Sequence, residues 1–323
     1  MRIAIIGGAG FVGAHLVSAL LQRGDQILIY DRHSGRIAQS DLIRCEQIRL
    51  VEAHICDGSR LLDELTRFSP DVICHFAALH YIPYCDRYPA ETLRVNVEGT
   101  LNVMLAASQI SGLRGVLFAS SVAVYAPTDA THGEREQPVP CDIYGLSKWL
   151  AEQVVEQYAC RLRISHLSLR FTNIYGPEET NPHVIPAVLQ QLLAGADTLR
   201  LGRTDPCRDF LYIDDLVNAL IAAISLLDGN EIHEVVNLGA GREWPVQAAV
   251  DILCRLSERE ICILRDEDRM RALDRMHLRA DITKARHLLA WEPRHDLRAG
   301  LEKTFCHERT KYMQHWAATE VSS

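Results

Sequence analysis

The chain has 323 residues, of which 48% are hydrophobic, so it is long enough to bury a substantial core in one large domain or two smaller ones. The formal net charge of −8 excludes a nucleic-acid-binding protein that works through a broad basic face, although a nucleotide ligand can still bind in a local pocket. No apolar run approaches the roughly 18 residues of a membrane span, so we expect neither a membrane segment nor a signal peptide.

The ten cysteines are scattered along the chain, and no two of them form a C-x-x-C pair. Several stand inside apolar runs. This usage predicts reduced and mostly buried thiols in a cytoplasmic protein, without a disulfide framework or a metal site.

The chain begins with an apolar run over residues 2–6, then the glycine-rich stretch 7–13, then helical spacing to about Gly24. Glycines at such a strand-to-helix turn let the backbone approach a pyrophosphate, and the helix N-terminus supplies N–H groups and a positive dipole. The predicted cofactor contacts in this stretch are Gly7, Gly10, Phe11, Val12 and Gly13.

A second buried strand over residues 26–31 ends in Asp31. A carboxylate at this position accepts hydrogen bonds from a ribose 2′-hydroxyl and repels a 2′-phosphate. The sequence therefore favours NAD over NADP as the cofactor.

The next strands are predicted at residues 48–55 and 71–78. Asp57, which follows the third strand, has two open interpretations: a contact to an adenine amino group, or an N-cap for a helix over residues 59–68. Ala77 and Ala78 end the fourth strand and are small enough to pass under a cofactor. The alternation of strands and helices predicts an α/β fold with a Rossmann-type doubly wound parallel sheet.

An aromatic loop over residues 79–89 follows the fourth strand, and it should face the ligand crevice at the carboxyl ends of the strands. His80 in this loop is a candidate substrate contact or second acid/base, because an imidazole pKa lies near neutrality. Asn96, inside a helix predicted at residues 90–108, either serves the site or is exposed.

The fifth strand, residues 115–121, ends in Ser121, and Tyr144 and Lys148 follow with the i, i+4 spacing that places both on one helix face. A neighbouring ammonium lowers the pKa of a phenol, which prepares Tyr144 to exchange a proton with a hydroxyl or carbonyl group. We predict these three residues as the catalytic group. No G-x-S-x-G motif is present, so Ser121 is not read as a nucleophile.

Together these motifs resemble the extended short-chain dehydrogenase/reductase family, and within it the NAD-dependent nucleotide-sugar 4-epimerases that act on UDP-glucose or UDP-glucuronate. The resemblance continues in order through the second half of the chain. Its motifs there are Leu169-Arg-Phe-Thr-Asn-Ile-Tyr-Gly-Pro177, Arg208-Asp-Phe-Leu-Tyr-Ile-Asp-Asp215, Val236-Asn-Leu-Gly-Ala-Gly241 and the segment Arg271-Ala-Leu-Asp274 with Asp281-Ile-Thr-Lys284.

The resemblance implies a role for each matching residue. Tyr144 is the acid/base on the sugar hydroxyl, Lys148 holds the nicotinamide ribose, and Ser121 orients the substrate oxygen. The resemblance also implies that three further residues bind the sugar diphosphate: Asn173, Arg208 and Arg271. A guanidinium fork matches phosphate oxygens, which agrees with this assignment.

The residues after Ser121 distinguish between related activities. The 4,6-dehydratases and the sugar-nucleotide decarboxylases carry a Glu close to this position, whereas Val122 and Ala123 stand here. Reversible oxidation at a sugar carbon, with C4 as the expected position, is then the simplest chemistry. The alternatives are an NAD(P)-dependent nucleotide-sugar oxidoreductase, an epimerase-reductase, or another rearrangement of the keto sugar. His183 in Asn181-Pro-His183 resembles the histidine of GDP-keto-sugar epimerase-reductases, although Asp31 disfavours the NADPH of that reaction.

Residues 1–172 are predicted to form the NAD-binding domain, with 207–240 returning to it. Residues 173–206 and 241–323 are predicted to form a smaller α/β domain that binds the nucleotide-diphosphate sugar. The resemblance also implies a homodimer through a four-helix seam built from about residues 91–108 and 143–159. The base, the sugar and the pathway of carbohydrate metabolism stay open.

Overall fold

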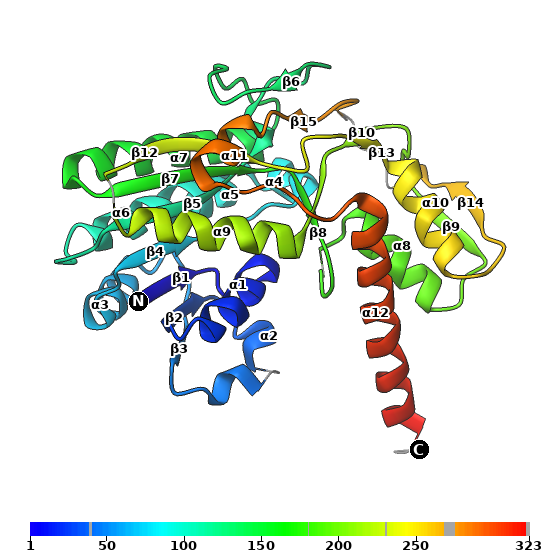
Figure 1. Ribbon diagram of the computed structural model, residues 1–323, viewed down its shortest axis with the longest axis horizontal. Helices are drawn as coiled ribbons and strands as arrows, with labels where there is room; N and C mark the ends of the chain where they lie inside the picture. The colour runs from blue at the N-terminus through cyan, green and yellow to red at the C-terminus, as the bar shows by residue number, and fades with distance from the viewer. Residues whose placement is uncertain (39–40, 180, 230, 268–274, 321–323) are drawn as a thin grey trace.

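The computed structural model describes residues 1–38, 41–179, 181–229, 231–267 and 275–320. In these ranges seven strands form one parallel sheet in the order β12-β7-β5-β4-β1-β2-β3 (Figure 1). The strands are β1 (Arg2–Ile6), β2 (Gln26–Asp31), β3 (Ile48–Glu52), β4 (Val72–His75), β5 (Gly115–Ser121), β7 (Ser165–Phe171) and β12 (His233–Leu238). This confirms the predicted doubly wound α/β fold.

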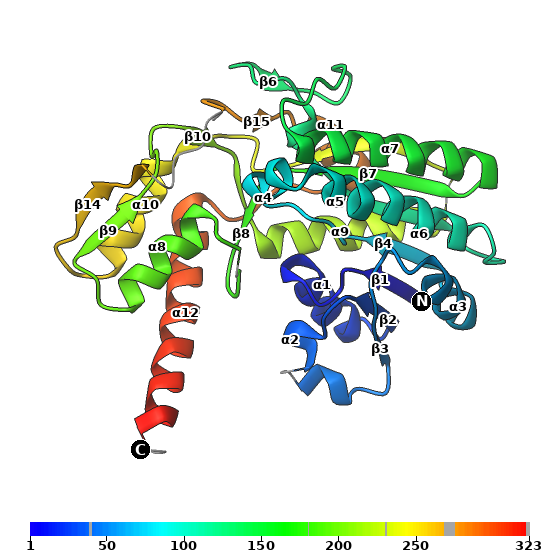
Figure 2. The same ribbon diagram turned by 180° about the vertical axis from the view of Figure 1, so that it is seen from behind.

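Helices cover both faces of the sheet, as Figures 1 and 2 show from opposite sides. On one face pack α1 (Phe11–Gln22) and α9 (Ile213–Leu227), and on the other α3 (Gly58–Phe68), α6 (Gly99–Ala107) and α7 (Ile143–Leu162). Side chains of a strand alternate between faces, so Ile3 and Ile5 enter the first core and Ala4 and Ile6 the second. This explains why β1 is a continuous apolar run.

The strand order reverses between β1 and β4, because successive strands run outward on opposite sides of β1. In open parallel sheets this switch point opens a crevice at the carboxyl ends of the strands, where ligands bind. The turn after β1 and the loops after β4 and β5 all lie at this edge.

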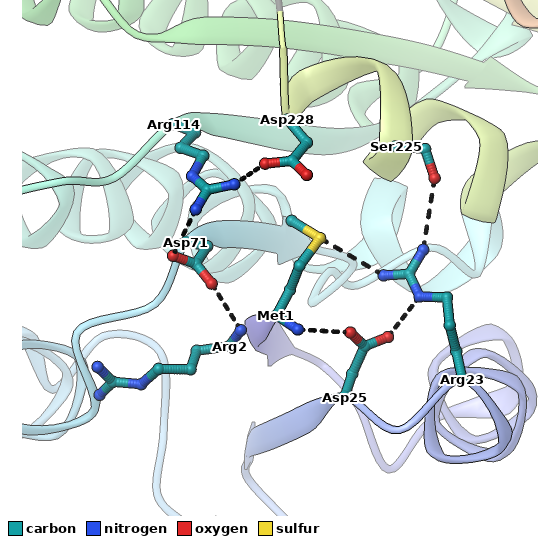
Figure 3. Close-up of polar contacts among 8 residues, drawn as sticks. All are labelled: Met1, Arg2, Arg23, Asp25, Asp71, Arg114, Ser225 and Asp228. Carbon is teal, nitrogen blue, oxygen red and sulfur yellow. Dashed lines mark hydrogen bonds and ion pairs between the residues drawn. The ribbon is translucent and has the colours of Figure 1, made fainter.

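A polar cluster secures the opposite edge of the sheet (Figure 3). Asp25 accepts from the Met1 ammonium at 2.9 Å and from Arg23 Nε at 2.6 Å, and Asp71 accepts from the Arg2 backbone N–H at 2.8 Å. Arg114, just before β5, pairs with both Asp71 and Asp228. The cluster therefore ties the start of β1 and the end of α1 to the neighbouring strand ends and to the end of α9.

The remaining elements gather beyond the carboxyl edge of the sheet (Figure 1). There β9 (Thr198–Leu201) pairs with β14 (Cys262–Arg265), and α8 (Val184–Leu193), α10 (Val246–Leu256) and α12 (Leu297–Glu320) pack on one another. Three short pairs join this part to the sheet: β8 (Asn173–Tyr175) with β11 (Phe210–Tyr212), β10 (Cys207–Arg208) with β13 (Trp244–Pro245), and β6 (Thr131–His132) with β15 (Arg279–Ala280).

Several short elements complete the described chain. They are α2 (Gly35–Ala38), η1 (Asp41–Arg44), α4 (Ile82–Arg87), α5 (Pro89–Leu93), the π-helical η2 (Arg94–Glu98), η3 (Val122–Val124) and α11 (Thr283–Leu289). None of the helices in the described ranges is both long enough and apolar enough to cross a membrane.

The prediction of a loop over the aromatic stretch 79–89 was wrong, because α4 lies within it. The helix predicted at about 90–108 is confirmed, since residues 89–107 are helical throughout, and η2 is a π-helical turn within it that was not predicted. A π-helical turn often marks a functional site. Here it carries Asn96, whose side chain points inward to the backbone of Leu79 rather than outward to solvent.

The third and fourth strands are shorter than predicted. β3 ends at Glu52 and β4 at His75. After β4 the backbone N–H groups of Phe76 and Ala77 both donate to Ile6 O, at 2.7 and 2.9 Å. The chain therefore turns across the end of β1, and pairing stops where the ligand crevice begins.

Candidate active site

A cavity of about 2080 Å³ runs along the carboxyl edge of the sheet and into the part that holds α8 and α12. Fourteen of the predicted site residues line it: Gly7, Gly10, Phe11, Val12, Gly13, Asp31, Ala77, Ala78, His80, Ser121, Tyr144, Lys148, Asn173 and Arg208. The fold thus brings together side chains that the sequence spreads over some 200 residues.

The glycine turn between β1 and α1 depends on close backbone approaches. Gly7 has a φ of +88°, and a Cβ added to it would lie 2.5 Å from Ala77 N. A Cβ on Gly13 would lie 2.5 Å from Gly7 O. The first turn of α1 has Gly10 as its N-cap without a side-chain cap hydrogen bond, so no capping side chain stands between this helix N-terminus and an anionic group.

Asp31 lies at the end of β2 and at the cavity wall. Its Oδ2 accepts from the Ala9 backbone N–H at 3.0 Å, which fixes the carboxylate beside the glycine turn. Partial burial raises its pKa, while the hydrogen bonds from Ala9 and His33 act in the opposite direction. These residues fit a dinucleotide, with its pyrophosphate on the α1 turn and its adenosine ribose on Asp31.

Two other predicted cofactor contacts do not line the cavity in the described residues. Asp57 is the N-cap of α3, and its Oδ1 accepts from the Arg60 backbone N–H at 3.0 Å, which agrees with the second of its two interpretations. Asn96 Oδ1 accepts from the Leu79 backbone N–H, and Asn96 Nδ2 donates to the Leu79 backbone oxygen, both at 2.8 Å. Asn96 Nδ2 also donates to Ser147 Oγ on α7. Asn96 therefore positions the loop that carries His80.

The first turn of α7 brings Tyr144 to Ser121. Asp142 caps this helix by accepting from Gly145 N at 2.7 Å. A Cβ on Gly145 would lie only 2.3 Å from Ala123 O, so glycine is required where α7 meets η3, directly after β5. Ser121 lies close enough to the Tyr144 hydroxyl to act on its pKa, and both residues line the cavity.

The prediction of a lowered Tyr144 pKa is wrong for the protein alone. Burial raises the pKa of Tyr144, and the hydrogen bond with Ser121 offsets this only in part. Lys148 Nζ instead donates to Ala119 O at 2.7 Å and lies 4.9 Å from the centre of the Phe118 ring. Lys148 is 3% exposed, and burial lowers its pKa to about 7.

A buried polar network lies beneath Lys148, and sequence reasoning missed it. Glu152, one turn further along α7 and 2% exposed, forms an ion pair with Arg170 through bonds of 2.7 and 2.9 Å. Glu152 also accepts from Ser120, the neighbour of Ser121. Its carboxylate opposes the fall in the Lys148 pKa. The i, i+4 spacing of Lys148 and Glu152 was the available signal.

Three polar residues form a second group at the cavity wall. His80 and His183 lie with ring centres 5.9 Å apart, and His183 Nδ1 lies 2.6 Å from Glu179 Oε1. Desolvation at the cavity wall, and then electrostatic repulsion from His183, lower the pKa of His80 to about 4. A neutral imidazole at pH 7 favours the hydrogen-bonding interpretation of His80 over that of a second acid/base.

The far part of the cavity offers donors and acceptors for an anionic ligand. Asn173 Oδ1 is buried and has no hydrogen-bond partner among the described residues. Arg208 Nη1 donates to the backbone oxygens of Cys207 and Arg275, at 2.8 and 2.7 Å. Arg271 lies outside the described residues.

Arg275 is a cavity residue that the sequence interpretation did not select. Its Nη2 donates to Ala123 O at 2.8 Å and lies 3.8 Å from Asp142, the cap of α7. It therefore ties the segment after residue 274 to the two elements that carry Ser121 and Tyr144. Its position four residues after Arg271 was a signal that could have marked it.

The assembled site suits proton and hydride exchange at a carbinol carbon. Ser121 and Tyr144 place two hydroxyl groups at the wall of one cavity, and no carboxylate directly follows Ser121 in the sequence. A model of the NAD dependent epimerase/dehydratase family matches residues 3–239 of this chain. The chain belongs to this family. The predicted family and its NAD dependence are confirmed by this match.

Relatives with this fold share most of the chain's length. The UDP-glucose 4-epimerase of Rhizobium meliloti is 30% identical over 322 residues, covering 94% of this chain and 96% of its own. The structure of MoeE5 in complex with UDP-glucuronic acid and NAD has a TM-score of 0.86 at 27% identity, covering 96% of this chain and all of its own.

A third similar protein is the UDP-glucose 4-epimerase of Thermotoga maritima, solved with UDP-glucose. Its TM-score is 0.85 at 26% identity, and the match covers 96% of this chain and 99% of its own. The family match and these relatives confirm the prediction of an NAD-dependent epimerase that acts on nucleotide sugars.

Proposed function

We propose that this enzyme inverts C4 of a UDP-sugar through a transient 4-keto intermediate. The observation that carries the proposal is the meeting of Tyr144 and Ser121 in the cavity that the glycine turn and Asp31 also line. The names of the similar proteins support UDP as the nucleotide and C4 as the reacting carbon.

Tyr144, Ser121 and Lys148 have separate roles in the proposed reaction. Bound NAD supplies a reversible hydride acceptor. Tyr144 takes the proton of the C4 hydroxyl as the C4–H leaves as hydride, and it returns that proton when hydride adds to the opposite face of the ketone. Ser121 would hold the same oxygen, and Lys148 would bind the cofactor ribose.

The substrate diphosphate belongs at the far end of the cavity. Arg208 offers a guanidinium fork there, and Asn173 adds an amide whose oxygen lacks a partner in the described chain. We keep Arg271 as a further diphosphate contact on the resemblance, and Asp57 as an adenine contact on its place after the third strand.

Replacement of Tyr144 by Phe tests this proposal. The variant removes one hydroxyl and should retain the fold and bound NAD, because the ring stays in place. We expect kcat for UDP-sugar epimerisation to fall roughly 10²–10⁴-fold, the usual contribution of an acid/base group. Full activity in this variant, measured by product analysis, would remove Tyr144 from the mechanism.

The remaining expectations are also proposals. We propose an NAD-binding domain of residues 1–172 with 207–240, and a sugar-binding domain of residues 173–206 and 241–323. The membership of α9 and β12 in the sheet layers supports the return of residues 207–240. The prediction of mostly buried thiols was wrong, because only Cys74 and Cys85 of the ten cysteines are buried. All ten are free thiols, which supports a cytoplasmic location, where thiols stay reduced.

A further inference from the structure

Three metal-ligating side chains meet outside the cavity. Cys207, Glu243 and His277 each offer one ligand atom, and these atoms all lie within 4.8 Å of one another. His277 Nδ1 lies 2.9 Å from Glu243 Oε1. None of the three belongs to the described lining of the cavity, so they form a separate cluster.

Backbone pairing holds the three side chains in place. Cys207 lies in β10, which pairs antiparallel with β13. Glu243 is the residue directly before β13. The Cys207 backbone N–H donates to Met276 O at 2.7 Å, beside His277. The ligands therefore come from three segments that are already hydrogen-bonded to one another, which limits the rearrangement that binding an ion requires.

The cluster has unused capacity to bind a cation. Glu243 Oε2 is buried and has no hydrogen-bond partner among the described residues. A thiolate and a carboxylate repel each other at this distance, and a bound cation would turn that repulsion into ligation.

We propose that Cys207, Glu243 and His277 form a Zn²⁺ site. Sulfur, imidazole nitrogen and carboxylate oxygen are the ligands that Zn²⁺ takes in proteins, whereas Ca²⁺ and Mg²⁺ select oxygen alone. Three protein ligands leave the fourth tetrahedral position to water, because His277 and Glu243 are partly exposed. This site departs from the sequence-based expectation of no metal.

The site would brace the wall of the cavity without touching the substrate. Arg208 follows Cys207 directly, and its Nη1 donates to the backbone oxygens of Cys207 and Arg275. A Zn²⁺ ion that joins Cys207 to His277 would fix the two backbone segments that these bonds connect. We therefore assign the ion a structural role behind the proposed diphosphate contact.

Metal binding to the full NAD-loaded chain tests the site. After treatment with a chelator, Zn²⁺ binding is measured by equilibrium dialysis with elemental analysis, and Co²⁺ is added separately as a spectroscopic probe. We expect about one ion per chain and a near-ultraviolet thiolate-to-Co²⁺ charge-transfer band. Zn²⁺ affinity should rise with pH, since the thiol must release its proton.

Two variants and one control locate the ion. Cys207→Ser should abolish the charge-transfer band, and His277→Gln should weaken Zn²⁺ binding by at least about tenfold. Cys262→Ser, which removes an exposed thiol on β14, should change neither. The proposal is overturned if the chain binds no stoichiometric Zn²⁺, or if Cys207→Ser binds Zn²⁺ and shows the band as the parent does.

Discussion

At the scale of single residues, two opposing effects set the pKa of Lys148. Burial pulls its pKa down to about 7, while the carboxylate of Glu152 acts against that fall. Its proposed role requires the charged form, so activity should be lost as pH rises through the Lys148 pKa. Glu152 therefore acts as a positioning residue that keeps the ammonium charged at neutral pH.

Replacement of Glu152 by Gln should move the alkaline limb of the kcat/KM–pH profile to lower pH by roughly one unit, because the opposing charge is lost. The amide keeps an acceptor for Arg170 and Ser120, and retention of NAD reports on the fold. Glu156→Gln, an exposed site one turn along the same helix, is the control and should leave the profile in place. An unshifted limb in the Glu152 variant would show that this carboxylate does not tune Lys148.

At the scale of elements, we expect the contact between the start of α7 and η3, directly after β5, to determine how close Tyr144 lies to Ser121. Glycine at position 145 permits that contact. Alanine in a helix is normally more stable than glycine by roughly 0.5–1 kcal/mol. Here the added Cβ would lie 2.3 Å from Ala123 O, so the steric clash should outweigh the helix preference of alanine.

We expect Gly145→Ala to cost about 1–3 kcal/mol of unfolding free energy, as overpacking usually does, and to lower kcat because Tyr144 shifts away from Ser121. Gly133→Ala is the matched control, since a Cβ there meets nothing within 4 Å. Denaturant unfolding and product assays measure both effects. A Gly145 variant as stable and as active as the Gly133 control would contradict this account of the contact.

The elements differ in how far the sequence predicts them. The strands at residues 2–6, 26–31 and 115–121 have the predicted bounds, because buried parallel strands are continuous apolar runs closed by turn residues. The π-helical turn at Arg94–Glu98 was missed, since it depends on the long-range bonds between Asn96 and Leu79. The Glu152–Arg170 pair was missed for the same reason: its partners lie on different elements.

At the scale of the whole molecule, we propose a homodimer whose seam includes α6 and α7. Leu105 on α6 is 46% exposed, which is unusual for a leucine on a helix whose other face is core. We expect Leu105→Lys to convert the dimer to a monomer, because a charge would be buried in the seam.

Light scattering coupled to size-exclusion chromatography measures the mass of both forms. Leu264→Lys is the control, since this exposed leucine lies on β14, away from the proposed seam. A parent chain that is monomeric at micromolar concentration would contradict the proposed dimer. A dimer that survives Leu105→Lys would place the seam elsewhere.

The cavity joins the two parts of the molecule, and its chemistry can be tested as a whole. The most direct measurement incubates the NAD-loaded enzyme with UDP-glucose and, separately, with UDP-glucuronate, while products are resolved and absorbance of reduced nicotinamide is followed. The account predicts interconversion of C4 epimers for at least one of these sugars without net reduction of NAD. Stoichiometric formation of reduced nicotinamide with substrate consumption, or no conversion of either sugar, would contradict it.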